Sequence, residues 1–195
     1  MQDIFKSVST DQLRWNIVRL FIKYESQHEF LIFNLKVILK NKHELFDSKL
    51  TAAEYLMQLD NLDGLIYVSD IVLNDNDLGF DFRHRFNSIS QIKKVEAIPI
   101  LLKLLKVAKQ SRFKEDQYHS LESVIFTSLY SIGIQSENSY LIVKDKLEDF
   151  IQENKGKIEH LNFIHSNIQK IEEQMYLNKS QSCKIEDAIE EFEKL

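Results

Sequence analysis

The stretch Val95-Glu-Ala-Ile-Pro-Ile-Leu-Leu-Lys-Leu-Leu105 combines a nearly continuous apolar run with the chain's one proline, Pro99. Proline lacks a backbone N–H, so it is tolerated in the first turn of a helix and disfavoured in its interior. The stretch therefore predicts a helix that begins near Ala97, with a kink or a separate turn before it.

Apolar residues recur at helical spacing on both sides of this stretch. Three stripes show it: Leu13, Ile17, Leu20, Phe21 and Tyr24; then Tyr140, Val143, Leu147, Phe150 and Ile151, preceded by Ser136-Glu137-Asn138; then Ile158, Leu161, Ile164, Ile168, Ile171 and Met175. The 195 residues include only 4 glycines. Few turn-forming residues mean few turns, so the sequence predicts an all-α fold without a sheet.

The predicted helices come in pairs, and we take the chain as one helical-repeat domain, 1–195. The pairs cover residues 10–47, 50–74, 94–133 and 137–178, followed by a C-terminal helix over 182–195. Their spacing is close to the period of about 40–47 residues in HEAT and armadillo repeats. Because one hairpin cannot bury its apolar face alone, this spacing predicts antiparallel pairs stacked as a short α-solenoid. A compact helical bundle is the alternative.

Two segments carry a resemblance to known repeats. Ala97-Ile-Pro-Ile-Leu-Leu-Lys-Leu-Leu105, with the apolar helix after it, is similar to HEAT-type repeats. Ala53-Glu-Tyr-Leu-Met-Gln-Leu-Asp-Asn-Leu-Asp-Gly-Leu65 resembles helical repeats that follow the ATPase core of bacterial NACHT and other STAND-type proteins. The resemblance spans residues 50–178 and implies a region that senses partners. The chain has no P-loop G-x-x-x-x-G-K-[ST], so it is not itself the ATPase.

No complete catalytic or metal-binding set is present in the sequence. Glu25-x-x-His28 and Asp116-x-x-His119 have the spacing of helical di-metal ligands, which also need glutamates from two further helices. Helix capping and surface polarity explain both pairs. H-E-x-x-H and G-x-S-x-G are absent. We therefore expect a protein that is not an enzyme and has no cofactor.

The sequence also predicts the cellular compartment of the protein. Its longest uncharged run, residues 123–136, is too short and too rich in serine to span a bilayer. No basic segment followed by an apolar one opens the chain, so no signal peptide is expected. A single cysteine, Cys183, excludes an internal disulfide. These features predict a cytoplasmic protein without membrane association.

Charge is distributed unevenly along the chain. Residues 83–114 carry 9 Lys/Arg and one acid, whereas residues 1–82 carry 8 Lys/Arg and 13 Asp/Glu, and residues 115–195 carry 8 and 16. An acidic protein partner or neighbouring domain would be attracted to the basic band. Nucleic acid or another polyanion is the alternative, since phenylalanines interleave the cations. The candidate binding residues are Arg83, Arg85, Lys93, Lys94, Lys103, Lys106, Lys109 and Arg112.

Overall fold

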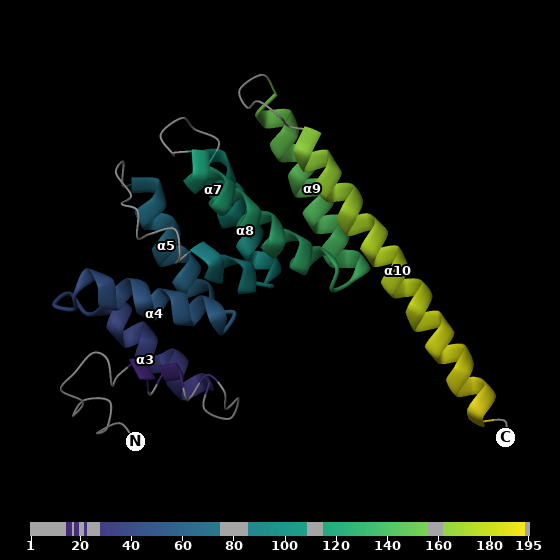
Figure 1. The fold of residues 1–195 in the computed structure, drawn as a ribbon, viewed down its shortest axis with the longest axis horizontal. Helices are drawn as coiled ribbons and strands as arrows, with labels where there is room; N and C mark the ends of the chain where they lie inside the picture. The colour runs from purple at the N-terminus through teal and green to yellow at the C-terminus, as the bar shows by residue number, and fades with distance from the viewer. Residues whose placement is uncertain are drawn as a thin grey trace. The chain divides into compact units, whose positions relative to one another are not determined.

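The structure, a computed structural model, describes Trp15, Asn16, Val18, Arg19, Ile22 and residues 28–74, 86–108, 115–155 and 162–193, with the backbone alone over 115–120, 162 and 182–193 (Figure 1). Within these ranges it contains seven α-helices, two 3-10 helices and no strand, so the predicted all-α class is confirmed. The helices are α3 (His28–Lys40), α4 (Phe46–Gln58), α5 (Leu62–Asn74), η3 (Asn87–Gln91), η4 (Val95–Ala97), α7 (Ile98–Ala108), α8 (Glu115–Gly133), α9 (Glu137–Glu153) and α10 (Asn162–Glu193).

The chain divides into two compact units, residues 1–92 (unit 1) and residues 93–195 (unit 2). At the junction Ile92 and Lys94 have extended backbone, with φ, ψ of −74°, 123° and −85°, 132°. This short extended segment separates η3 from η4. The sequence predicts one domain over residues 1–195, and this stays a prediction.

Unit 1 is built on α3, α4 and α5. Its core includes Val18, Leu31, Leu35, Ala52 and Leu56, all 0% exposed. An aromatic contact adds to it, because the ring of Trp15 stacks on Tyr55 at 5.8 Å between centroids. Arg19 Nε donates a hydrogen bond of 2.9 Å to the Tyr55 hydroxyl. These contacts tie the segment before α3 to α4.

The turn between α4 and α5 stops one helix and starts the next. Asp60 has a left-handed backbone, φ 52°. Its N–H donates to Met57 O at 2.9 Å, and Asn61 N–H donates to Leu56 O at 2.9 Å, which is the Schellman pattern of a helix C-terminus. Asn61 Oδ1 then accepts from Asp63 N at 3.1 Å and satisfies an N–H at the start of α5.

Unit 2 begins as its proline predicts. The short helix η4 ends at Ala97, and α7 follows with Pro99 in its first turn. The predicted start near Ala97, with a separate turn before it, is confirmed. Ser136 is the N-cap of α9, since its hydroxyl accepts from Ser139 N at 3.1 Å, again in agreement with the sequence.

Helices α8 and α10 approach closely at Gly133. A Cβ atom there would lie 2.6 Å from Ile171 Cγ2. Ile171 belongs to the predicted stripe of α10, whose members Ile164, Ile168 and Ile171 are all buried. Because the glycine lacks a side chain, this part of α10 can lie against α8.

The structure corrects the predicted C-terminal helix over 182–195. Helix α10 is continuous from Asn162 to Glu193, so residues 179–181, between the two predicted elements, are helical as well. Asn and Ser have lower helix propensity than Ala, but the cost is below about 1 kcal/mol per residue. No Gly or Pro interrupts residues 162–193, so nothing in the sequence stops the helix.

Helix α10 runs beside α9 and then continues past it (Figure 1). Lys179 Nζ lies 3.6 Å from Glu137 Oε2, so residue 179 is level with the first residue of α9. Residues 180–193, which we name the α10 extension, therefore lie beyond the N-terminal end of α9. Among the helices that the structure describes, none has the length and apolar character needed to cross a membrane.

Candidate functional site

Four of the predicted binding residues can be placed. Lys93, Lys94, Lys103 and Lys106 are exposed residues of unit 2. The other four, Arg83, Arg85, Lys109 and Arg112, lie outside the described residues. Lys103 and Lys106 share one side of α7. They line a groove whose opposite wall the sequence does not predict.

The two lysines belong to the exposed face of α7. Pro99, Lys103 and Lys106 follow one another at spacings of four and three, which places them on one side of a helix. Apolar residues cover the other side, where Ile98, Leu101, Leu104, Leu105 and Ala108 are at most 1% exposed. The sequence pattern thus fixes which way the lysines face.

Helix α9 supplies the opposite wall of a groove beside this face. The groove has a volume of about 320 Å³ and is named here the α7–α9 groove. It is lined by Pro99, Leu102, Lys103, Lys106, Lys146, Asp149, Phe150, Glu153 and Asn154. Phe150 is 6% exposed and Leu102 is half-buried. The floor is therefore apolar and the rim is charged.

The charged residues of the rim differ in whether they form ion pairs. Lys146 Nζ lies 3.1 Å from Asp149 Oδ2 and 3.5 Å from Asp145 Oδ2. The hydrogen bond to Asp149, together with the charges of both acids, raises the pKa of Lys146 above its ordinary value. Among the described residues, Lys103 and Lys106 have no ion-pair partner within 4 Å. The groove thus offers two uncompensated ammonium groups beside an apolar floor.

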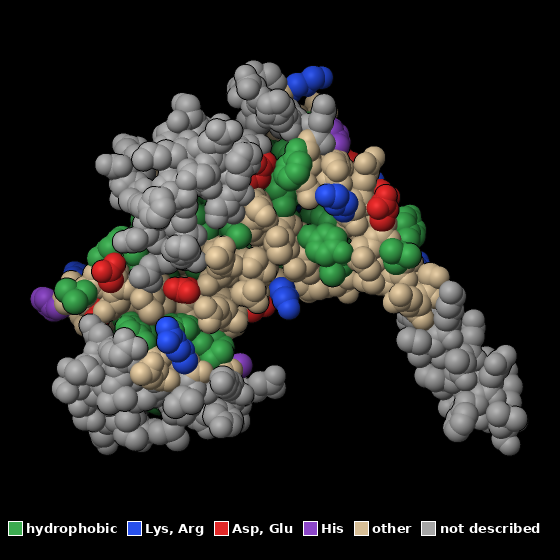
Figure 2. Space-filling model, in the orientation of Figure 1, with side chains coloured by type: hydrophobic (Ala, Val, Ile, Leu, Met, Phe, Trp, Pro, Cys, Tyr) green, Lys and Arg blue, Asp and Glu red, His purple; other side chains and the backbone are tan. Residues whose placement is uncertain are grey.

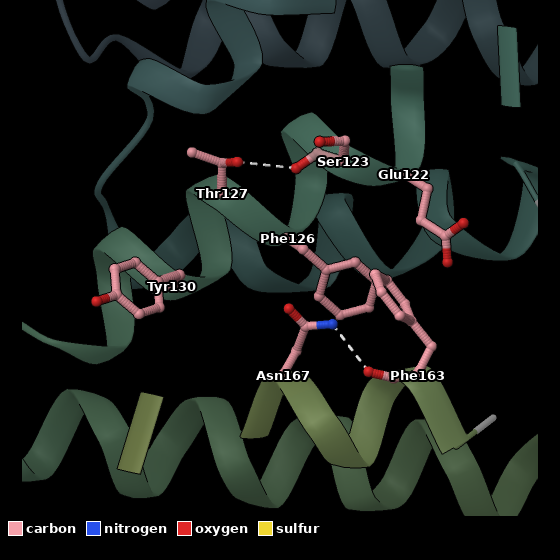
Figure 3. Close-up of a pocket in the computed structure, with 7 residues that line it drawn as sticks. All are labelled: Glu122, Ser123, Phe126, Thr127, Tyr130, Phe163 and Asn167. Carbon is pink, nitrogen blue, oxygen red and sulfur yellow. Dashed lines mark hydrogen bonds between the residues drawn. The ribbon is translucent and has the colours of Figure 1, made fainter. Parts of the chain in front are cut away.

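A second groove lies between α8 and α10 and is named the aromatic groove (Figure 3). Its volume is about 580 Å³, and it is lined by Glu122, Ser123, Phe126, Thr127, Tyr130, Phe163 and Asn167. The rings of Phe126 and Phe163 meet edge to face, 5.2 Å apart at 88°. Figure 3 shows this pair between Glu122 at one end and Tyr130 at the other.

Local hydrogen bonds hold the polar groups of the aromatic groove. Thr127 Oγ1 donates to Ser123 O at 2.9 Å, and Asn167 Nδ2 donates to Phe163 O at 2.8 Å (Figure 3). The sequence does not predict this groove, because Phe163 lies outside the apolar stripe predicted over residues 158–175. Only the packing of α8 on α10 brings Phe126 and Phe163 together.

Apolar side chains also remain exposed outside the grooves. In unit 2, Leu141, Tyr176 and Leu177 are 54–60% exposed. Figure 2 shows hydrophobic side chains on the visible face over α9 and α10. In unit 1, Phe33 and Val37 are exposed one helical turn apart on α3. Single exposed apolar residues of this kind are common on folded proteins and do not by themselves mark a binding surface.

The lining residues of the two grooves include no histidine and no cysteine. Neither groove therefore pairs a hydroxyl or thiol nucleophile with an imidazole base. No group of three or more His, Cys, Asp or Glu that could hold a metal ion occurs among the described residues.

Of the two acid–histidine pairs with di-metal spacing, only His28 can be assessed. Its Nε2 donates to Ile22 O at 3.0 Å. Glu25 and the side chains of Asp116 and His119 lie outside the described residues. The hydrogen bond of His28 ties the start of α3 back to the segment before it.

Comparison of the chain with protein-family models, curated proteins and solved structures finds no match.

Proposed function

We propose that the chain is a non-catalytic helical-repeat module that binds an acidic segment of another protein in the α7–α9 groove. The observation that carries this proposal is the pair Lys103 and Lys106, which have no described ion-pair partner and stand beside an apolar floor. A peptide that presents carboxylates next to a leucine or phenylalanine would meet both kinds of surface. Charge complementarity of this kind favours fast and selective association.

The acids of the groove favour a protein partner over nucleic acid. Asp149 and Glu153 line the same groove as the lysines. A phosphate backbone would approach both carboxylates, whereas a peptide can place apolar side chains there. The floor made by Leu102 and Phe150 has no use in binding phosphates. Nucleic acid remains an outcome that the experiment below distinguishes.

The packing of unit 2 supports the repeat architecture. Within it α7 contacts α8 and α9, and α8 contacts α9 and α10. In a solenoid, the first helix of one hairpin packs on the first helix of the next hairpin, and the second helix packs on the second. We infer that the chain is a short solenoid of HEAT-like repeats, similar to those of bacterial NACHT and STAND-type proteins, acting in the cytoplasm within or beside a larger multidomain protein. An elongated small-angle scattering profile would support the solenoid, and a near-spherical one would contradict it.

The test of binding is a fluorescence anisotropy titration with two probes. One is a labelled amphipathic helical peptide of leucine and glutamate, and the other is random-sequence RNA and DNA. We expect the wild-type chain to bind the peptide, and Lys103→Glu with Lys106→Glu to weaken binding by at least about tenfold, since like charges then face each other.

A matched control separates the groove from net charge. Lys42→Glu with Lys170→Glu changes the charge by the same amount at two exposed lysines elsewhere. This control should bind the peptide as the wild type does. Equal loss in both double variants, or tighter binding of nucleic acid than of peptide with log affinity falling linearly against log salt concentration, would overturn the proposal.

A further inference from the structure

Among the helices that the structure describes in unit 2, none runs beside the α10 extension past the end of α9 (Figure 1). Helix α9 has 17 residues and α10 has 32. At 1.5 Å per residue the 14 residues beyond Lys179 add about 21 Å of helix past the end of α9. An isolated helix of this length is marginal in water, so a partner for it would stabilise it.

The sequence of the α10 extension predicts an amphipathic surface. Ile185, Ala188, Ile189 and Phe192 are spaced by three, one and three residues, which on a helix is one face. Residues 180–193 carry five acids and one base, Lys184. The extension thus combines an apolar stripe with acidic flanks, and this is the chemistry that the α7–α9 groove is suited to bind.

The α10 extension cannot reach the groove of its own chain. The α9 residues that line the groove are 146–154, at the C-terminal end of that helix. The extension starts at the opposite end, where Lys179 meets Glu137. From that point it runs away from the groove, because α10 is one continuous helix (Figure 1). Its occupancy of such a groove therefore requires a second molecule.

We propose that the α10 extension of one copy of this chain binds in the α7–α9 groove of a second copy. This names the acidic partner and so rests on the function proposed above. The apolar stripe of the extension covers Leu102 and Phe150, and its carboxylates approach Lys103 and Lys106. The sequence from Lys93 to Lys114 contains seven Lys/Arg and one acid, Glu96, so the α7 wall of the groove lies in a basic segment. Asp149 and Glu153 stand on the α9 wall, so the carboxylates of the extension would approach the α7 side.

Two acids are best placed to meet the lysines. Glu186 and Glu193 are seven residues apart and directly follow Ile185 and Phe192, so they share one edge of the apolar stripe. Asp187 and Glu190 fall about 200° and 140° around the helix from Ile185, on the opposite side. They supply a matched control with the same change of charge on the same helix.

The first experiment measures self-association of the full chain by sedimentation velocity over a range of protein concentrations. We expect concentration-dependent oligomers that weaken at high salt, because screening shortens the reach of the charges. Lys103→Glu with Lys106→Glu, and separately Glu186→Lys with Glu193→Lys, should each weaken association by at least about tenfold. Asp187→Lys with Glu190→Lys should leave it near the wild-type level.

Mixing the two disruptive variants gives the decisive result. Each alone has like charges in the groove and on the extension, whereas each variant's extension is complementary to the groove of the other. We therefore expect the mixture to associate while the separate solutions stay monomeric. Recovery on mixing would also show that both variants are folded.

Three results would overturn the proposal: a wild-type chain that stays monomeric at every concentration, a mixture that does not associate, or a control variant that fails as completely as the groove variants. Failure here is distinguishable from failure of the proposed function. A monomeric chain whose groove still binds the leucine–glutamate peptide would refute only the second copy as partner. A chain that binds neither would refute both.

Discussion

Ionisation of one side chain, Tyr140, makes the stability of unit 2 depend on pH. Its phenol is 5% exposed and lies near Glu172 of α10 and Lys144 of α9. Lys144 Nζ is 5.7 Å from the centre of the Tyr140 ring. Burial, with a contribution from Glu172, raises the pKa of Tyr140 above its usual 10.0, although Lys144 opposes the shift. The fold therefore accommodates the neutral phenol better than the phenolate.

The raised pKa of Tyr140 lowers the free energy of unfolding at alkaline pH. The unfolded chain ionises Tyr140 near pH 10, while the folded chain does so only at higher pH, so stability is fully present below pH about 10 and falls as pH rises through the folded pKa. Tyr140→Phe should reduce the loss of stability in urea unfolding between pH about 9 and 11. Lys144 and Lys146 also have raised pKa values, so part of the loss will remain.

The control for this prediction is Tyr176→Phe. Tyr176 is 60% exposed on α10, so removal of its hydroxyl should disturb the fold little. Its removal should leave the alkaline stability profile unchanged. Identical profiles for Tyr140→Phe and the wild type would contradict the assignment of the pH dependence to the buried phenol.

At the level of elements, α4 and α5 depend on Gly64 for their close approach. A Cβ atom at this position would collide with Ala53 O and would lie 2.9 Å from Leu56 Cβ and 3.0 Å from Met57 Cγ. Two of the three neighbours are backbone or Cβ atoms, which cannot turn aside. The helices would have to separate, and the buried surface between them would open.

Gly64→Ala should therefore destabilise unit 1 even though alanine is the better helix former. We expect a loss of about 1–3 kcal/mol, the usual cost of overpacking, against a propensity gain of about 1 kcal/mol. Chemical unfolding followed by circular dichroism would measure it. Asp70→Ala, at an exposed position of the same helix, is the control. A stabilised Gly64→Ala variant would show that the helices are not in close contact at this point.

The elements also show what periodicity can and cannot predict. The predicted pair over 50–74 ends at the same residue as α5, Asn74. The first helix of this pair, α4, begins at Phe46 rather than at residue 50. Phe46 is 55% exposed, so burial of apolar residues does not mark where α4 begins. The prediction divides α10 at its polar residues, although only Gly or Pro terminates a helix decisively.

For the whole molecule, the division at residues 92 and 93 predicts that unit 2 folds alone. Its core, from Ile98 on α7 to Ile171 on α10, is drawn from its own helices. The segment 93–195 should therefore give a helical circular dichroism spectrum and a cooperative thermal transition. A gradual, non-cooperative transition would show that unit 1 contributes to its stability.

The candidate site was only half predictable at this scale. Lys103 and Lys106 stand out in the sequence because the surrounding charge is basic. Asp149 and Phe150 are some 45 residues later and show no sign of their shared groove until α7 and α9 pack together. Charge patterns reveal one wall of a site, whereas the second wall is a property of tertiary structure.

The position of Lys179 opposite Glu137 has one more consequence if the copies associate as proposed. Groove and extension lie at opposite ends of α9, so each copy offers a different surface to the molecule before it and to the molecule after it. Such a contact is heterologous, and the assembly has a polarity. It ends only when the rotation per copy closes a ring, and otherwise it grows as a filament whose two tips differ. One tip then presents an empty groove and the other a bare helix, so growth can be stopped separately at either tip.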